Sequence, residues 1–212
     1  MDKSHDKILK LLKLKILNED NGAHLVILDH VKKCLKEFDE PLTAVLMGIA
    51  YGGEVEAIAK LWGKRGKVYG YDTFEDLHPR HLATTDFEAI CMNNWYRDCG
   101  TEKLSIEYQR KALEKLSNTT LIKGEVHKDS CKDIPKIHLA FLDMDILKSM
   151  KEGYAAVKDK IVPGGYLFLH DANNILLPDI CEWALKKVMT DKKNWKSADI
   201  WREELMISFV KK

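Results

Sequence analysis

The chain has 212 residues and a mass of 24.4 kDa, the size of one large domain. Its 34 basic and 33 acidic residues give a formal charge of +1, so no global field favours nucleic acid or an anionic membrane as a partner. The five cysteines form no C-x-x-C pair, and we expect neither a disulfide framework nor a zinc site. Because no apolar run resembles a signal peptide or a membrane span, the sequence predicts a cytoplasmic protein.

Two amphipathic helices are predicted within residues 1–40. Leucine and isoleucine alternate with lysine over residues 8–17, and apolar residues recur at helical spacing over residues 25–38. The segment between them, Asn18–Gly22, is rich in residues that end helices. We expect these helices to pack on the core of their own domain or on a partner in a homodimer. Residues 41–212 then form the main domain.

Beyond Pro41, short apolar runs alternate with helical segments, which is typical of an α/β protein with helices on both faces of a mostly parallel sheet. The expected strands are residues 42–49, 67–72, 120–126, 137–144 and 166–170. Helices are expected at residues 55–62, 150–161 and 178–189. Two short apolar segments near the end, 198–201 and 205–210, predict an antiparallel hairpin. The long stretch 82–116 predicts an inserted helical layer or lid.

A glycine-rich turn follows the first expected strand. Gly48, Gly52 and Gly53 lie where the strand meets the next helix, so a ligand can approach bare backbone and the positive end of that helix. Asp72 ends the second strand about twenty residues later, where a carboxylate can accept hydrogen bonds from ribose hydroxyls. The spacing matches neither the dinucleotide pattern nor a phosphate loop, which disfavours NAD and ATP. The alternative is a tight turn that needs glycine only for its own geometry.

Carboxylates stand at the ends of two further strands. Asp143 closes the fourth expected strand and Asp171 follows the fifth, with Asp145 and His170 beside them. Because the carboxyl ends of parallel strands meet at the ligand-binding edge of an α/β sheet, we expect these side chains to lie close together. Oxygen and imidazole ligands suit Mg²⁺ or a similar divalent ion. The alternative is that Asp143 and Asp145 cap the following helix and that Asp171 only ends a strand.

Four blocks of the sequence, taken together, match the pattern of a known family. They are Gly48-Ile-Ala-Tyr-Gly-Gly, Val68-Tyr-Gly-Tyr-Asp-Thr-Phe-Glu-Asp-Leu, Phe141-Leu-Asp-Met-Asp-Ile-Leu-Lys-Ser and Val162-Pro-Gly-Gly-Tyr-Leu-Phe-Leu-His-Asp. In this order they resemble the class I S-adenosylmethionine-dependent methyltransferases of the macrocin O-methyltransferase (TylF-like) group, over residues 42–210. The resemblance implies a Rossmann-like α/β fold whose seven-stranded sheet is mostly parallel, with an antiparallel last strand.

The resemblance also implies a cofactor site. In the family the glycine turn holds the methionine part of S-adenosylmethionine, and the carboxylate after the second strand holds the ribose. The residues that match in this chain are Gly48, Tyr51, Gly52, Gly53 and Asp72.

A metal site is implied as well. TylF-like and catechol-type O-methyltransferases have metal-binding acids at positions that match Asp143 and Asp171. His170 is the candidate third ligand for Mg²⁺, and with Asp143 it is also a candidate catalytic residue that accepts the proton of the acceptor hydroxyl.

These features predict an S-adenosylmethionine-dependent methyltransferase that methylates a hydroxyl of a small hydroxylated metabolite, assisted by a divalent metal. We expect no nucleic acid and no membrane partner. One alternative is a nucleic-acid methyltransferase, although the [ND]-P-P-[YF] turn that such enzymes use is absent after the fourth strand. The other is a non-catalytic cofactor-binding subunit, since Leu46 and Ala172 replace an acid and an asparagine of the related families.

Overall fold

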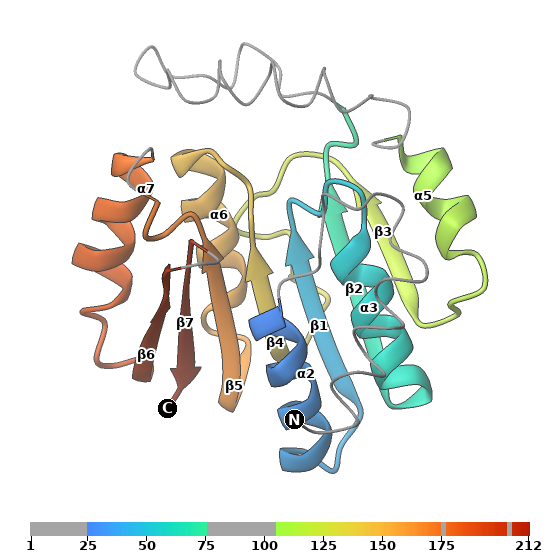
Figure 1. Ribbon diagram of the computed structural model, residues 1–212, viewed down its shortest axis with the longest axis horizontal. Helices are drawn as coiled ribbons and strands as arrows, with labels where there is room; N and C mark the ends of the chain where they lie inside the picture. Colours follow the sequence, from blue (N-terminus) through green and yellow to red (C-terminus); the bar gives the residue numbers. More distant parts are fainter. Residues whose placement is uncertain (1–24, 76–104, 175–176, 203–204) are drawn as a thin grey trace.

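The computed structural model describes residues 25–75, 105–174, 177–202 and 205–212. Seven strands form one sheet in the order β3-β2-β1-β4-β5-β7-β6. The strands are β1 (Leu42–Met47), β2 (Gly66–Asp72), β3 (Thr119–Lys123), β4 (Ile137–Leu142), β5 (Ile161–His170), β6 (Trp195–Trp201) and β7 (Met206–Lys211). Strands β1 to β5 pair in parallel, whereas β7 is antiparallel to both neighbours, β5 and β6 (Figure 1). This confirms the predicted mostly parallel sheet with an antiparallel last strand.

Helices cover both faces of the sheet (Figure 1). They are α2 (Leu25–Glu37), α3 (Gly53–Trp62) with the 3₁₀ turn η1 (Gly63–Arg65), α5 (Ile106–Leu113), α6 (Leu147–Val157) and α7 (Pro178–Trp183), which continues as the π-helical η4 (Ala184–Val188). In β4, Leu139 and Phe141 join the core under α2 and α3, while Ala140 and Leu142 join the core under α6. Because both faces are covered, every residue of β4 is buried, which explains its continuous apolar run.

The start of β5 differs from the sequence prediction. Residues 150–161 were expected to be helical, but α6 ends at Val157 and β5 already includes Ile161. The pairing moves from Ile161 to Tyr166 along β5 while β4 advances only from Ile137 to Leu139. Gly164 has φ 81° within this irregularity, and the neighbouring proline has no N–H for the ladder. The Pro-Gly-Gly sequence therefore marks a bulge in a strand, not the end of a helix. The third strand is also shorter than expected and ends at Lys123.

The second of the two expected N-terminal helices is α2, which packs on the sheet and on α3. Ile27, Val31 and Cys34 are fully buried, and Trp62 of α3 donates a hydrogen bond from Nε1 to the carbonyl of Val31 (3.0 Å). The first expected helix, residues 8–17, lies outside the described residues, as does most of the expected lid at 82–116, whose described end contains α5. A homodimer stays a prediction.

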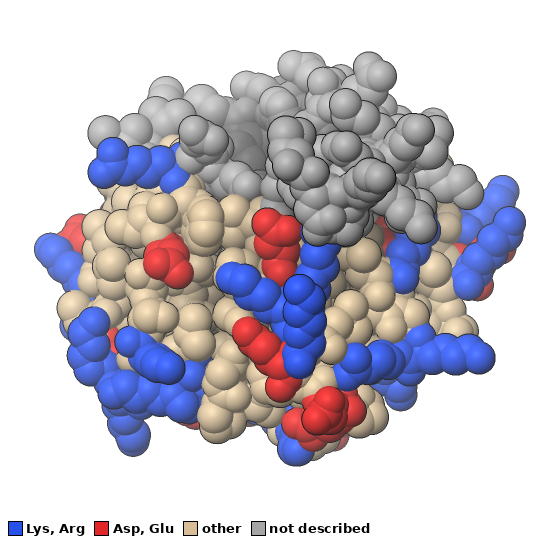
Figure 2. Space-filling model, turned by 60° about the horizontal axis from the view of Figure 1, so that its bottom comes forward, with Lys and Arg blue, Asp and Glu red and all other residues tan. Residues whose placement is uncertain are grey.

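The surface at the edge where the parallel strands begin carries both signs of charge. Figure 2 shows lysine and arginine side chains spread over this face with acidic side chains between them. Among the described helices, none has the length and apolar character that crossing a membrane requires.

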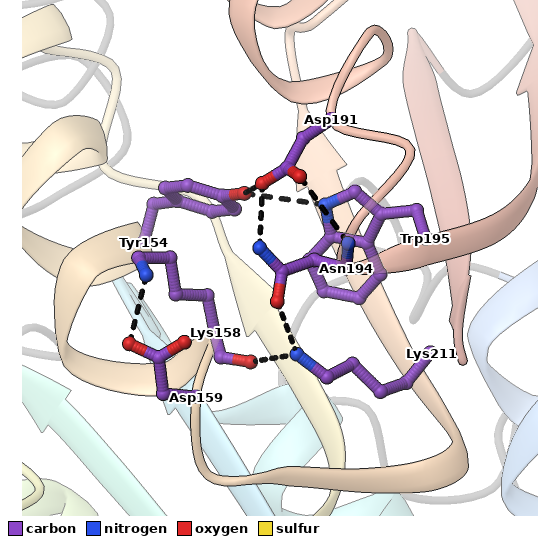
Figure 3. Close-up of polar contacts among 7 residues, drawn as sticks. All are labelled: Tyr154, Lys158, Asp159, Asp191, Asn194, Trp195 and Lys211. Atoms are coloured by element: carbon purple, nitrogen blue, oxygen red, sulfur yellow. Dashed lines mark hydrogen bonds and ion pairs between the residues drawn. The ribbon is translucent and has the colours of Figure 1, made fainter.

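A polar cluster at the same edge ties β7 to α6 (Figure 3). Lys211 of β7 donates from Nζ to the Lys158 carbonyl and to Oδ1 of Asn194, both at 2.7 Å. Asn194 in turn donates from Nδ2 to Asp191 (2.6 Å), which also accepts a hydrogen bond from the Tyr154 hydroxyl (3.4 Å). We call these five residues the lower cluster. The lower cluster holds the antiparallel strand β7 in place by contacts in which each charged group has a polar partner.

Candidate functional site

The turn after β1 is packed against the end of β4. Gly48 has φ 79° and donates its N–H to the Tyr71 carbonyl (2.9 Å). A Cβ atom at Gly48 would lie 1.7 Å from the carbonyl oxygen of Asp143, and the Asp143 N–H donates to the Met47 carbonyl (2.8 Å). Close packing thus explains why this position is glycine. It also joins the predicted cofactor turn directly to the acidic end of β4.

Asp72 holds the turn in shape from the end of β2. Its Oδ2 accepts hydrogen bonds from the N–H groups of Ile49 (2.8 Å) and Ala50 (3.0 Å), and its Oδ1 accepts one from Phe74 (2.9 Å). Burial raises the pKa of Asp72 despite these backbone donors, which favour the charged form. The carboxylate therefore organises the backbone of the turn. Its predicted contact with a ribose stays a prediction.

The start of α3 opens onto the turn. Gly52 has φ 76° and donates its N–H to the Ile49 carbonyl (2.7 Å), and α3 begins at Gly53 with no side-chain cap at its N-terminus. The positive end of the helix dipole therefore faces the turn that contains Tyr51. The backbone N–H groups at this end can bind an anionic group of a ligand, against the charges of Glu54 and Glu56 in the first turn of α3.

Gln109 on α5 contacts this turn, and no motif in the sequence predicted this role. Its side chain is 1% exposed and donates from Nε2 to the carbonyl of Ala50. A Cβ atom at Gly52 would lie 2.8 Å from its Oε1. The signal in the sequence is an amide between Ile106 and Leu113, on the buried face of a short helix.

The predicted acids come together at the ends of β4 and β5. Asp143, Asp145, His170 and Asp171 each offer a ligand atom, and these atoms all lie within 4.8 Å of one another. His170 Nδ1 lies 2.8 Å from Oδ1 of Asp143 and 3.1 Å from Oδ2 of Asp171. Asn174 donates from Nδ2 to Oδ1 of Asp171 (2.7 Å). We call Asp143, Asp145, His170 and Asp171 the acidic cluster. The sequence had predicted no metal-binding or catalytic role for Asp145.

Burial and the neighbouring charges together determine the protonation of the acidic cluster. Burial raises the pKa of Asp145 well above its usual range, and the charges of Asp143 and Asp171 raise it further. Burial opposes the charged form of His170, but the two carboxylates outweigh it and raise its pKa to about 11. Against the effect of burial, His170 lowers the pKa of Asp171. At neutral pH the imidazole is therefore protonated in this arrangement.

Backbone geometry argues against a purely structural role for these acids. Asp145 and Asp171 have φ of 57° and 56°, in the left-handed region that non-glycine residues rarely adopt. The N-cap position of α6 is Ile146, whose side chain makes no capping hydrogen bond. Neither Asp143 nor Asp145 therefore stands at the N-cap position of α6.

Several solved structures with a similar fold are methyltransferases. The O-methyltransferase NovP matches with a TM-score of 0.66 and 15% identity, over 88% of this chain and 78% of NovP. PaMTH1, a methyltransferase from Podospora anserina solved with SAH bound, matches with a TM-score of 0.58 and 10% identity, over 100% of this chain and 89% of its own. The chain has the fold of class I methyltransferases. An rRNA methylase from Streptococcus thermophilus has it too, with a TM-score of 0.56 and 13% identity over 93% of this chain and 99% of that one.

Within this methyltransferase fold, all the candidate residues lie at one edge of the sheet. The turn follows β1, Asp72 ends β2, Asp143 follows β4, and His170 and Asp171 mark the end of β5. No protein-family model matches the chain, and a search of curated proteins finds no match. Because identities of 15% and below show the fold alone, the reaction and the acceptor follow only from the site.

Proposed function

We propose that the chain is an S-adenosylmethionine-dependent methyltransferase that methylates a hydroxyl of a small metabolite beside a divalent metal ion. The observation that carries this proposal is the contact between Gly48 and the Asp143 carbonyl. It places a turn suited to the methyl donor next to a cluster suited to a metal and a hydroxylated acceptor. A methyl transfer needs these two partners side by side.

The acidic cluster fits a divalent cation by its donor set. Three carboxylates and one imidazole offer atoms within 4.8 Å of one another, and Mg²⁺ prefers carboxylate oxygens. Burial first, and then the charges of Asp143 and Asp171, raise the pKa of Asp145, and a bound cation would offset both effects. Asp143, Asp171 and His170 would hold the ion. When bound, the ion would lower the pKa of the acceptor hydroxyl and orient it.

The chain's own residues would position the reactants. Asp72 fixes the turn, so its glycine backbone and the start of α3 are organised before the cofactor binds. Asp143 joins the two halves of the site, because its N–H binds the Met47 carbonyl and its carboxylate lies against His170. These contacts would align the acceptor oxygen with the methyl carbon for in-line displacement.

His170 holds a proton at neutral pH, shared with Asp143 across 2.8 Å. It can therefore hold the ion or act as a base only after that proton has left, because a protonated imidazole has no free lone pair. The predicted catalytic role of His170 depends on this order of events.

Calorimetric titration tests the proposal. The protein is titrated with S-adenosylhomocysteine and, for comparison, NAD, each with and without Mg²⁺. We expect binding of S-adenosylhomocysteine and no binding of NAD. A protein that binds neither would contradict the proposed function.

Methyl transfer from labelled S-adenosylmethionine then separates the remaining alternatives. Polyhydroxylated small molecules should accept the methyl group in a reaction that EDTA stops. Transfer to RNA would instead support the function of the rRNA methylase that shares this fold. Cofactor binding without transfer to either class would support a non-catalytic subunit.

A further inference from the structure

Gln109 presents a buried acceptor to the turn between β1 and α3. Gln109 is 1% exposed, and its Nε2 donates a hydrogen bond to the Ala50 carbonyl. Its Oε1 is buried as well, and in the part of the chain that the structure describes it has no hydrogen-bond partner. Buried polar atoms without a partner are rare, and at a functional site they indicate a missing ligand group.

The position of this oxygen defines what it can bind. A Cβ atom at Gly52 would lie 2.8 Å from Oε1 and 3.5 Å from Cδ of Gln109, so the amide lies directly over Gly52. Only glycine at position 52 allows the Gln109 amide to lie this close to the turn. Oε1 therefore faces the last residue before α3, at the point where a ligand would meet the helix.

Two complementary groups thus meet at Gly52. The start of α3, which has no side-chain cap, favours an anion, whereas the carbonyl oxygen of Gln109 can only accept a hydrogen bond from a donor. An anion and an N–H donor separated by one carbon atom are the carboxylate and the ammonium group of an α-amino acid. The turn therefore has the polarity to recognise an amino-acid end rather than a phosphate.

We propose that Gln109 binds the α-ammonium group of the cofactor's methionine portion through Oε1. This inference rests on the proposed function and assigns one recognition step to a residue of α5. The Nε2 of the same amide holds Ala50, so one side chain both shapes the turn and binds its ligand.

The test compares three ligands: S-adenosylhomocysteine, its analogue without the α-amino group, and 5′-methylthioadenosine, which lacks the whole amino-acid end. Calorimetry measures their affinities for the wild type, Gln109→Leu and Gln109→Glu. In the wild type, S-adenosylhomocysteine should bind about tenfold or more tightly than the deaminated analogue. Gln109→Leu should abolish this preference, and because it also loses the hydrogen bond to Ala50 it should lower the affinity for 5′-methylthioadenosine, but by less than the affinity for S-adenosylhomocysteine. Gln109→Glu, which keeps an acceptor at the position, should retain the preference.

The ratio of affinities isolates recognition from a general loss of structure. Arg110→Leu, an exposed change on the same helix, is the matched control and should leave every ratio unchanged. Equal losses for all three ligands in Gln109→Leu, or an unchanged preference, would overturn the assignment and leave Gln109 as a brace for the turn. A wild type that binds none of the three would overturn the proposed function itself.

Discussion

The two polar clusters of this chain lie at opposite edges of one sheet and are built on opposite principles. In the lower cluster (Figure 3), one lysine and one aspartate are joined through Asn194, and the hydrogen bonds of Asn194 lower the pKa of Asp191. In the acidic cluster, three carboxylates share one histidine, and the pKa of Asp145 rises well above its usual range. In the lower cluster the lysine and the aspartate have opposite charges, whereas the three acids of the acidic cluster outnumber its one histidine.

The same contrast extends along both edges. At the lower edge, Asn118 donates from Nδ2 to three carbonyl oxygens at 2.9 to 3.1 Å. At the upper edge, Oε1 of Gln109 and Oδ1 of Asn173 are buried without a partner among the described residues. The described non-glycine residues with positive φ all lie in connections at this upper edge: Ala50, Phe74, Asp145, Asp171 and Leu205. Strain and unpaired groups of this kind collect where a protein binds ligands. One edge therefore stabilises the fold, and the other carries the site.

The largest expected effect on this comparison comes from glycines of the two edges. Gly48→Ala should lower the free energy of unfolding by about 3 kcal/mol or more, because the new Cβ atom collides with the Asp143 carbonyl at φ 79°. At the lower edge, Gly63→Ala should cost less, about 1 to 2 kcal/mol, because only the backbone strain at φ 52° and ψ −130° opposes it and no atom lies within 4 Å. Urea unfolding measures both. Equal losses would show that the contact with Asp143 adds nothing.

Removing one acid from each cluster should separate metal binding from structure. Asp171→Asn should weaken Mn²⁺ binding on the order of a hundredfold, because a charged ligand is replaced by a neutral one. Asp191→Asn in the lower cluster should leave Mn²⁺ affinity unchanged. Calorimetry or electron paramagnetic resonance of Mn²⁺ gives both affinities. Unaltered binding in Asp171→Asn would place the metal elsewhere or nowhere.

Asp72→Ala should weaken S-adenosylhomocysteine binding about tenfold to a hundredfold. The change leaves the N–H groups of Ile49, Ala50 and Phe74 without their acceptor, so the turn loses its shape. Asp39→Ala, an exposed change at the lower edge, is the control and should bind like the wild type. If Asp72→Ala binds as tightly as the control, neither the turn nor the ribose depends on this carboxylate.

The smallest expected effect is a pH dependence that originates at the lower edge. His138 is 1% exposed; Nδ1 accepts the Thr43 N–H (3.0 Å), and Nε2 faces Glu40 (3.3 Å), with Lys136 nearby. Burial lowers its pKa, although Glu40 opposes this shift. Below about pH 6.5, His138 is protonated in the unfolded chain but stays neutral in the folded chain. Acidification therefore lowers the free energy of unfolding. His138→Gln should reduce this slope by at most about 1.4 kcal/mol per pH unit. An identical slope in the variant would exclude His138 as its source.

The sequence predicted the sheet well because its central strands are buried on both faces and therefore appear as continuous apolar runs. It failed at β5, where the apolar spacing up to Ile161 and the following Pro-Gly-Gly imitate the end of a helix. The order of the strands brings Asp143 and Asp171 together, and the positions of both could be predicted. Gln109 could not, because its role depends on a contact with Ala50 far away in the chain, which no local pattern encodes.

The contact between Gly48 and Asp143 also bears on how such chains diverge. If the proposed function holds, main-chain groups fix the spacing between the donor and acceptor sides: the Asp143 carbonyl, its N–H and the Met47 carbonyl. Substitution of surrounding side chains can alter the acceptor without moving this backbone joint. The joint itself requires a glycine at position 48 and the main chain at the end of β4. This small requirement is compatible with a fold shared with NovP at 15% identity. New acceptor specificities would arise by replacing the segments around the joint while the methyl donor keeps its place.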